Sequence, residues 1–131
     1  MEEATSKLAT VTTIRRIASY KDLEIWQEGI RLVKITYAFT AAFPKEELYG
    51  LTSQMRRAVV SIPSNIAEGC ARRSRNEYRQ FLYVALGSLA EFETLWVIAK
   101  ELGRCETVDE RVEPIVEKLR AKILTLLRRL S

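Results

Sequence analysis

The chain has 131 residues, of which 47% are hydrophobic and 29% are charged, with a formal net charge of +4. This length and balance suit one compact domain and exclude a disordered chain. Histidine is absent, which removes the commonest general base and the commonest metal ligand. Only five glycines and three prolines occur, so the composition favours an all-α fold over a β fold rich in turns.

Residues 1–20 are rich in Thr and Ser and show no helical periodicity, so we expect an N-terminal tail before one domain at 21–131. The segment begins with acidic residues and lacks a long apolar core, which argues against a signal peptide. We find no run of 18 apolar residues and expect no membrane span. The simplest prediction is a cytoplasmic protein that does not contact a membrane.

Four helices are predicted, at about 22–43, 46–69, 75–102 and 107–130. Pro44 should end the first helix, because proline disfavours helical geometry in the residue before it. Gly69 and Gly103 stand where a left-handed residue is expected to end the second and third helices. Ser74 with Glu77 fits a capping box at the start of the third helix.

The fourth helix has a less regular start, where Thr107 and Glu110 form a similar pattern but Pro114 could bend or delay the helix. Apolar residues recur at 3-4 spacing in all four segments, which is typical of helices that pack at a shallow angle. Short connections make neighbouring helices antiparallel. The expected architecture is therefore an antiparallel up-down-up-down four-helix bundle.

Three residues in the second and third helices are candidates for structural specificity. Pro63 should bend its helix, either to follow the bundle or as a hinge. Asn65 occupies an apolar seam position, where an amide fixes register or assembly, or alternatively contacts a ligand. Gly87 is predicted to lie opposite Ala58, where small residues allow two helix backbones to approach closely.

The residue inventory offers no catalytic site, no cofactor site and no metal site. The chain has no glycine-rich phosphate loop and no Gly-x-Ser-x-Gly motif, and Glu91 and Glu93 point to different faces of one helix. Cys70 and Cys105 follow the second and third helices, so an up-down bundle places them about 40 Å apart. That distance excludes a disulfide within one chain.

Charge is the most informative feature, because the basic residues are segregated. The segment 56–79 has a local charge of +4, and the last fourteen residues have a local charge of +5. Arginine suits phosphate geometry, and the N–H groups at the start of the third helix attract anions. The predicted nucleic-acid-binding residues are the six arginines of this segment, Arg56, Arg57, Arg72, Arg73, Arg75 and Arg79.

Two readings of the basic segment remain open. It binds a nucleic-acid backbone, or it forms a solvated rim of ion pairs, for example with Glu68. Apart from Tyr78, no aromatic residue is interleaved with these arginines in the sequence, which argues against base stacking on single strands. The wide apolar surface of the third helix also has two possible interpretations. Trp96 either completes the monomer core or contributes to an interface between copies.

Several separated motifs resemble one protein family. They are YKDLEIWQ at 20–27, FPKEELYGLTSQMRRA at 43–58, SIPSNIAEG at 61–69 and ALGSLAE at 85–91. In this order they resemble the four-helix bundle proteins encoded in intervening sequences of bacterial 23S ribosomal RNA genes. The resemblance implies a bacterial cytoplasmic protein that forms a ring-like homopentamer. The family also looks related to the accessory variability proteins of diversity-generating retroelements, which engage nucleic acid and a reverse transcriptase.

These observations predict a non-catalytic, homo-oligomeric protein associated with RNA or another nucleic acid. The arginine cluster is the physical reason to expect nucleic-acid binding, and the resemblance implies RNA in particular. The alternative is a protein-interaction scaffold or accessory subunit for a partner such as a polymerase or reverse transcriptase.

Overall fold

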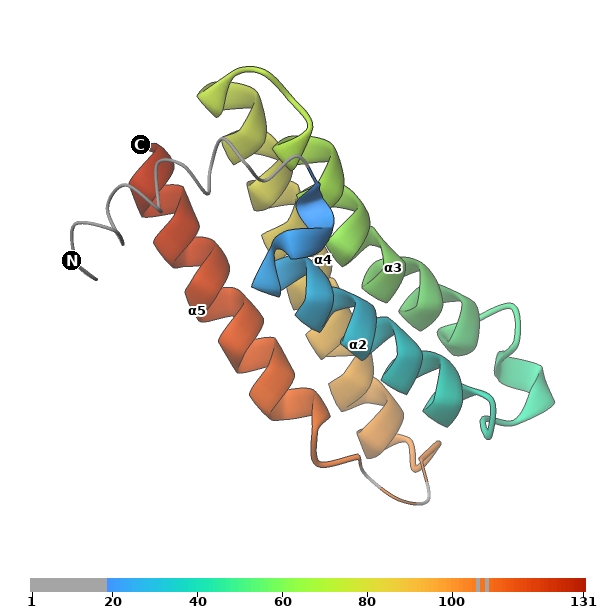
Figure 1. The fold of residues 1–131 in the computed structure, drawn as a ribbon. Helices are drawn as coiled ribbons and strands as arrows, with labels where there is room; N and C mark the ends of the chain where they lie inside the picture. Colours follow the sequence, from blue (N-terminus) through green and yellow to red (C-terminus); the bar gives the residue numbers. More distant parts are fainter. Residues whose placement is uncertain (1–18, 106, 108) are drawn as a thin grey trace.

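The computed structural model describes residues 19–131 except 106 and 108. Its long helices are α2 (Glu24–Thr40), α3 (Leu51–Cys70), α4 (Arg75–Glu101) and α5 (Val112–Leu130), and two 3-10 turns are η1 (Tyr20–Asp22) and η2 (Lys45–Glu47). Consecutive long helices run in opposite directions (Figure 1). The predicted all-α four-helix bundle is confirmed, while residues 1–18, most of the predicted tail, lie outside the described residues.

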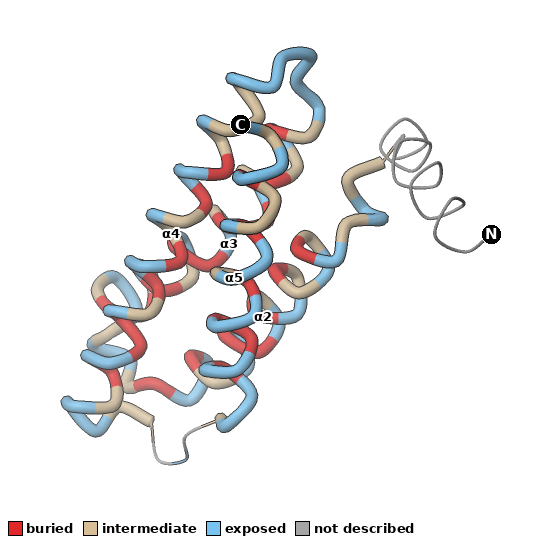
Figure 2. Tube along the Cα trace, turned by 90° about the vertical axis from the view of Figure 1, so that its left-hand side faces the viewer, coloured by how far each residue is buried: buried red, intermediate tan, exposed pale blue. Residues whose placement is uncertain are grey.

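The core lies between the four helices, where one face of each is buried (Figure 2). α3 contacts α2 and α4, and α5 contacts the same two helices from the other side. Trp96 is only 1% exposed and packs against Phe39 of α2, with 4.9 Å between the ring centroids. Trp96 therefore completes the core of the single chain rather than an interface between copies.

The central helix α4 is long and apolar enough, by length and composition, to cross a membrane, and 39% of its most apolar stretch is buried in the bundle. This property was missed by the search for an unbroken apolar run. A core helix of a bundle has the same composition, and α4 buries Leu82, Phe92 and Trp96 completely or nearly so. α4 thus packs one side into the core of the bundle and leaves the other side exposed.

The first two predicted helices are longer than the observed ones. α2 ends at Thr40, and Phe43 lies in the following turn, where it is buried and packs against Phe39. Pro44 then begins η2, and α3 starts only at Leu51, after Gly50. The prediction of a helix from residue 46 is wrong, because the chain makes a separate 3-10 turn there before it reverses direction.

α4 begins at Arg75, as predicted, and the Ser74 Oγ accepts a hydrogen bond from the Glu77 N–H at 3.1 Å. α5 begins at Val112 rather than at residue 107, and its N-cap, Arg111, makes no side-chain capping bond. The predicted cap at Thr107 is therefore wrong. Pro114 lies in the first turn of α5. Proline is tolerated there, because an N–H group in the first turn has no hydrogen-bond partner within the helix.

The glycines have different roles from those predicted. Gly103 has φ 66 and follows α4, as expected, but Gly69 has no positive φ and lies inside α3. A Cβ on Gly69 would lie 2.8 Å from the Cβ of Phe81, so this glycine lets α3 and α4 approach closely. The close approach predicted at Gly87 is wrong, because Gly87 is exposed and a Cβ there would have no neighbour within 4 Å.

Pro63 is buried within the continuous helix α3 and packs against Gly29 of α2. A Cβ on Gly29 would lie 3.2 Å from the Pro63 Cβ. Here a proline ring fills the space that a glycine leaves open on the neighbouring helix. The sequence marks Pro63 as unusual, but it does not indicate its partner.

Candidate nucleic-acid interface

Basic segments from two parts of the chain meet at one end of the bundle. The turn between α3 and α4 lies at the same end as the C-terminus of α5 in both views (Figures 1 and 2). A direct contact joins them, since the Arg79 Nη1 donates a hydrogen bond of 2.6 Å to the Leu127 carbonyl. Arg79 therefore satisfies a carbonyl in the last turn of α5, and its guanidinium is partly committed to the fold.

Arg72 is also committed to contacts within the chain. Its guanidinium lies 3.0 Å from the Glu68 carboxylate, 3.8 Å from that of Glu77 and 4.9 Å from the ring centroid of Phe81. Glu77 in turn accepts a hydrogen bond from the Ser74 hydroxyl. These two carboxylates neutralise part of the local positive charge. At Arg72, the structure therefore supports the interpretation of this segment as a rim of ion pairs.

Four other arginines at this end are exposed and have no acidic partner among residues 19–131 other than 106 and 108. Arg73 lies in the turn between α3 and α4, and Arg75 is the first residue of α4. Arg128 and Arg129 lie in the last turn of α5. We call these four residues the basic end. The Arg128 Nη2 donates a hydrogen bond of 3.2 Å to Thr125 Oγ1, but none of the four is neutralised by a carboxylate among the described residues, so they are available to an anionic ligand.

Arg56 and Arg57 do not belong to the basic end. They lie in the first half of α3, about 20 Å along the helix from its C-terminus. Arg56 Nε donates a hydrogen bond of 2.9 Å to Thr40 Oγ1, and the guanidinium lies 4.4 Å from the ring centroid of Tyr37. The six arginines that are clustered in the sequence are thus divided between two separate places.

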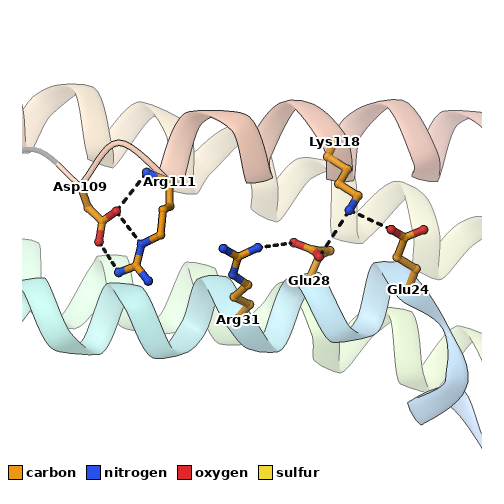
Figure 3. A network of polar contacts seen from close by, with 6 residues as sticks. All are labelled: Glu24, Glu28, Arg31, Asp109, Arg111 and Lys118. Carbon is orange, nitrogen blue, oxygen red and sulfur yellow. Dashed lines mark hydrogen bonds and ion pairs between the residues drawn. The ribbon is translucent and has the colours of Figure 1, made fainter.

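The basic residues of α5 before its last turn form ion pairs with neighbouring helices. Lys118 lies 2.8 Å from Glu24 and 3.5 Å from Glu28 of α2 (Figure 3). Lys122 contacts Glu24 as well, and Arg120 contacts Glu93 of α4. The charge of this segment in the sequence therefore overstates the positive surface that it offers to a ligand.

The pKa values follow from these pairs. Hydrogen bonds from Lys118 and then Lys122 lower the pKa of the Glu24 carboxyl, and Glu24 raises the pKa of Lys118. At the far end of α5, the Arg111 guanidinium lowers the pKa of Asp109 (Figure 3). All of these shifts favour the charged forms of surface ion pairs, which is the signature of a structural contact rather than of an acid–base catalyst.

Asn65 is half-buried and belongs to a small polar network between α3 and α4. Its Nδ2 donates to the Ser61 carbonyl at 2.8 Å and to the Ser61 Oγ at 2.9 Å. Ser61 Oγ and Ser88 Oγ are 2.7 Å apart, which links the two helices. The network agrees with a specificity role for Asn65, but it does not test that role against ligand contact.

The outward side of α4 and its C-cap exposes large apolar residues in two groups, one in the first half of the helix and one at its C-terminal end. They are Tyr83, Val84, Val97, Ile98 and Leu102, and we call them the α4 outer face. Gly87, Ala90, Glu91 and Thr94 are exposed between them. The wide apolar surface predicted for this helix thus has one half in the core and the other half facing solvent.

A surface hollow of about 580 Å³ lies where the C-terminal half of α2 meets the start of α3. Its lining comprises Tyr37, Leu48, Tyr49, Thr52, Ser53, Arg56, Arg57 and Val60. The expectation that no aromatic residue accompanies the arginines is wrong, because Tyr37 and Tyr49 stand beside Arg56 and Arg57. The sequence conceals this grouping, since Tyr37 comes from a different helix and Tyr49 from the turn before α3.

Among the residues that the structure describes, no group of three or more Asp, Glu or Cys side chains could hold a metal ion. Comparison with protein families gives one match, to the family described as 23S rRNA-intervening sequence protein, over residues 21–126. A comparison with curated proteins gives no match. The family match covers all four long helices except the last turn of α5, and it supports a small non-catalytic protein.

Proposed function

The chain belongs to the 23S rRNA-intervening sequence protein family, and we propose that it is a homo-oligomeric protein that binds structured RNA through its basic end. The observation that carries the proposal is the convergence of Arg73, Arg75, Arg128 and Arg129 at one end of the bundle without acidic partners among the described residues. Guanidinium groups bind phosphate oxygens in a bidentate manner. The first N–H groups of α4 add a favourable potential for anions at the same place.

The chemistry of the basic end favours the phosphate backbone of a paired RNA over its bases. Among the described residues, no aromatic ring stacks on any of the four arginines of the basic end; the nearby rings of Phe81 and Tyr83 lie beside Arg72 and Arg79 instead. Binding of this kind depends on charge and shape and falls steeply with salt. Several copies of one basic end in an assembly would increase the avidity for a long RNA.

The α4 outer face supports the homo-oligomeric part of the proposal. Apolar patches of this kind on a soluble chain are typical of protein interfaces, and a second copy supplies an identical apolar face. Family resemblance implies a ring-like pentamer of this bacterial, cytoplasmic protein. Changing Val84 and Val97 to lysine should lower the mass measured by sedimentation velocity to that of one 15.1 kDa chain. Leu124→Lys, at a similarly exposed site on α5, is the matched control.

The alternative use of the α4 outer face is to dock a partner protein such as a polymerase or reverse transcriptase. This function predicts a monomer in isolation and an interaction that is insensitive to salt and to the arginines. A monomeric mass for the wild-type protein would therefore contradict the homo-oligomer and favour the scaffold.

RNA binding is tested by titrating a blunt RNA hairpin at 50 and 200 mM salt with the wild type and with an Arg73→Glu/Arg75→Glu variant. We expect the variant to bind at least tenfold more weakly and its salt dependence to fall by about one unit of slope per arginine. A Lys34→Glu/Lys45→Glu variant changes the charge equally on exposed residues away from the basic end. Equal affinities for the two variants, or no wild-type binding at 50 mM salt, would refute the function.

A further inference from the structure

The hollow at the start of α3 is a second RNA site, and we propose that it binds an unpaired base through Tyr49 and the adjoining phosphate through Arg57. This inference rests on the proposed RNA-binding function and names a different part of the RNA as its ligand. A single-stranded tail or a loop supplies such a base, whereas a fully paired stem does not. The site thus distinguishes RNA with unpaired nucleotides from fully paired RNA.

Tyr49 is the first observation. Its side chain is 93% exposed, whereas every other large hydrophobic residue on the described surface is at most 57% exposed. It lies at the rim of the hollow, and Leu48 and Val60 provide a partly exposed apolar lining beside it. A flat base can stack on such a ring and cover the apolar lining, because every base offers a π-face to an aromatic side chain.

The charge of the hollow is the second observation. None of its eight lining residues is acidic, and two of them are arginines. Arg56 is fixed by its hydrogen bond to Thr40 Oγ1 and by the Tyr37 ring. Arg57 is exposed and has no ion-pair partner among the described residues, although it also lines a neighbouring hollow with Glu91.

An aromatic ring, an apolar lining and an available arginine side by side match the two parts of a nucleotide. The base requires the ring and the lining, and the phosphate requires the guanidinium. An acidic peptide would use the arginines but would have no need of the exposed ring. The combination therefore favours a nucleotide as the occupant.

The position of the hollow agrees with simultaneous use of both sites. It lies about 20 Å from the basic end along α3, a distance that a short single-stranded extension of a bound stem can span. The basic end would hold the paired stem, and the hollow would hold a nucleotide of the extension.

The experiment compares two RNA probes, a blunt hairpin whose loop is replaced by a non-nucleotide linker, so that it has no unpaired base, and the same hairpin with a ten-nucleotide unpaired tail. Tyr49→Ala and Arg57→Ala should each weaken binding of the tailed hairpin about tenfold and leave the affinity for the blunt hairpin unchanged. Tyr49→Phe should retain the wild-type affinity, because it keeps the stacking ring. Lys34→Ala serves as a control for loss of an exposed cation elsewhere.

The possible failures are distinct. If Tyr49→Ala binds the tailed hairpin as tightly as the wild type while Arg73→Glu/Arg75→Glu does not, the hollow is not a nucleotide site but the proposed function stands. If the wild type binds neither probe at 50 mM salt, both proposals fail. If polyglutamate binds in an Arg57-dependent manner and the RNA tail adds no affinity, the occupant is an acidic peptide and the inference is wrong.

Discussion

The same substitution, glycine to alanine, should have opposite effects at Gly69 and Gly87. A Cβ on Gly69 would lie 2.8 Å from the Phe81 Cβ and 3.1 Å from the Tyr78 Cδ1, whereas one on Gly87 would have no neighbour within 4 Å. Both residues lie within helices. Gly69→Ala should therefore destabilise the bundle, and Gly87→Ala should stabilise it.

The magnitudes follow from two competing effects. Alanine is favoured over glycine inside a helix by about 1 kcal/mol. Gly87→Ala should therefore raise the free energy of unfolding by roughly 0.5–1 kcal/mol. At Gly69 the Cβ contact is roughly 0.7 Å shorter than a comfortable carbon–carbon distance of about 3.5 Å. The nearest atom belongs to the rigid base of a side chain, so α3 and α4 must separate, and overpacking of this kind costs about 1–3 kcal/mol. The difference between these two effects is a net loss of up to about 2 kcal/mol for Gly69→Ala.

The assay is equilibrium unfolding in urea, followed by circular dichroism and by the fluorescence of the buried Trp96. Sedimentation velocity on each sample ensures that variants are compared in the same assembly state, since assembly changes apparent stability. The reasoning is refuted if Gly69→Ala is at least as stable as the wild type. It is equally refuted if Gly87→Ala is the less stable of the two variants.

Three further predictions concern polar contacts. Asn65→Leu should keep the helical content measured by circular dichroism but change assembly or register, and an unchanged mass and elution volume would exclude a specificity role. Lys118 lowers the pKa of Glu24, so the pair stabilises the fold above the ordinary pKa of a glutamate and is lost as pH falls through the lowered value. The difference in urea midpoint between the wild type and Glu24→Gln should thus shrink from pH 7 to pH 3, and a constant difference would contradict the ion pair. Thiol titration without reductant should find two free thiols, because Cys70 and Cys105 are both free. Burial raises the pKa of both thiols, so each should react more slowly in the native protein than in urea, and a missing thiol would contradict the topology.

The fold could be predicted from the sequence because its main determinants are local. Apolar 3-4 spacing identified all four long helices, and the Ser74 cap placed the start of α4 to the residue. The C-terminal end of α2 and the N-terminal end of α5 were harder to predict from the sequence. Both depend on tertiary packing, since Phe43 is buried in a turn and α5 begins only at Val112. Helix boundaries respond to such packing more than to propensity.

The candidate sites were only partly accessible from the sequence, because a count of charges does not identify their partners. Arg73 and Arg75 were placed correctly beside the start of α4, but nothing local shows that Glu24 and Glu93 neutralise the lysines and arginine of α5. The hollow was missed altogether. Tyr37 reaches Arg56 through the packing of α2 on α3, Tyr49 comes from the turn before α3, and no motif records this grouping.

The charged pairs between α5 and α2 have a consequence for how α5 is aligned. Lys118 and Lys122 lie one helical turn apart and face Glu24 and Glu28, which are also one turn apart. Sliding α5 by one turn would retain part of this pairing, whereas sliding it by two turns would abolish it. Exposed ion pairs of this kind add little to overall stability. These four side chains therefore favour the same alignment along the bundle axis that the buried apolar face of α5 requires.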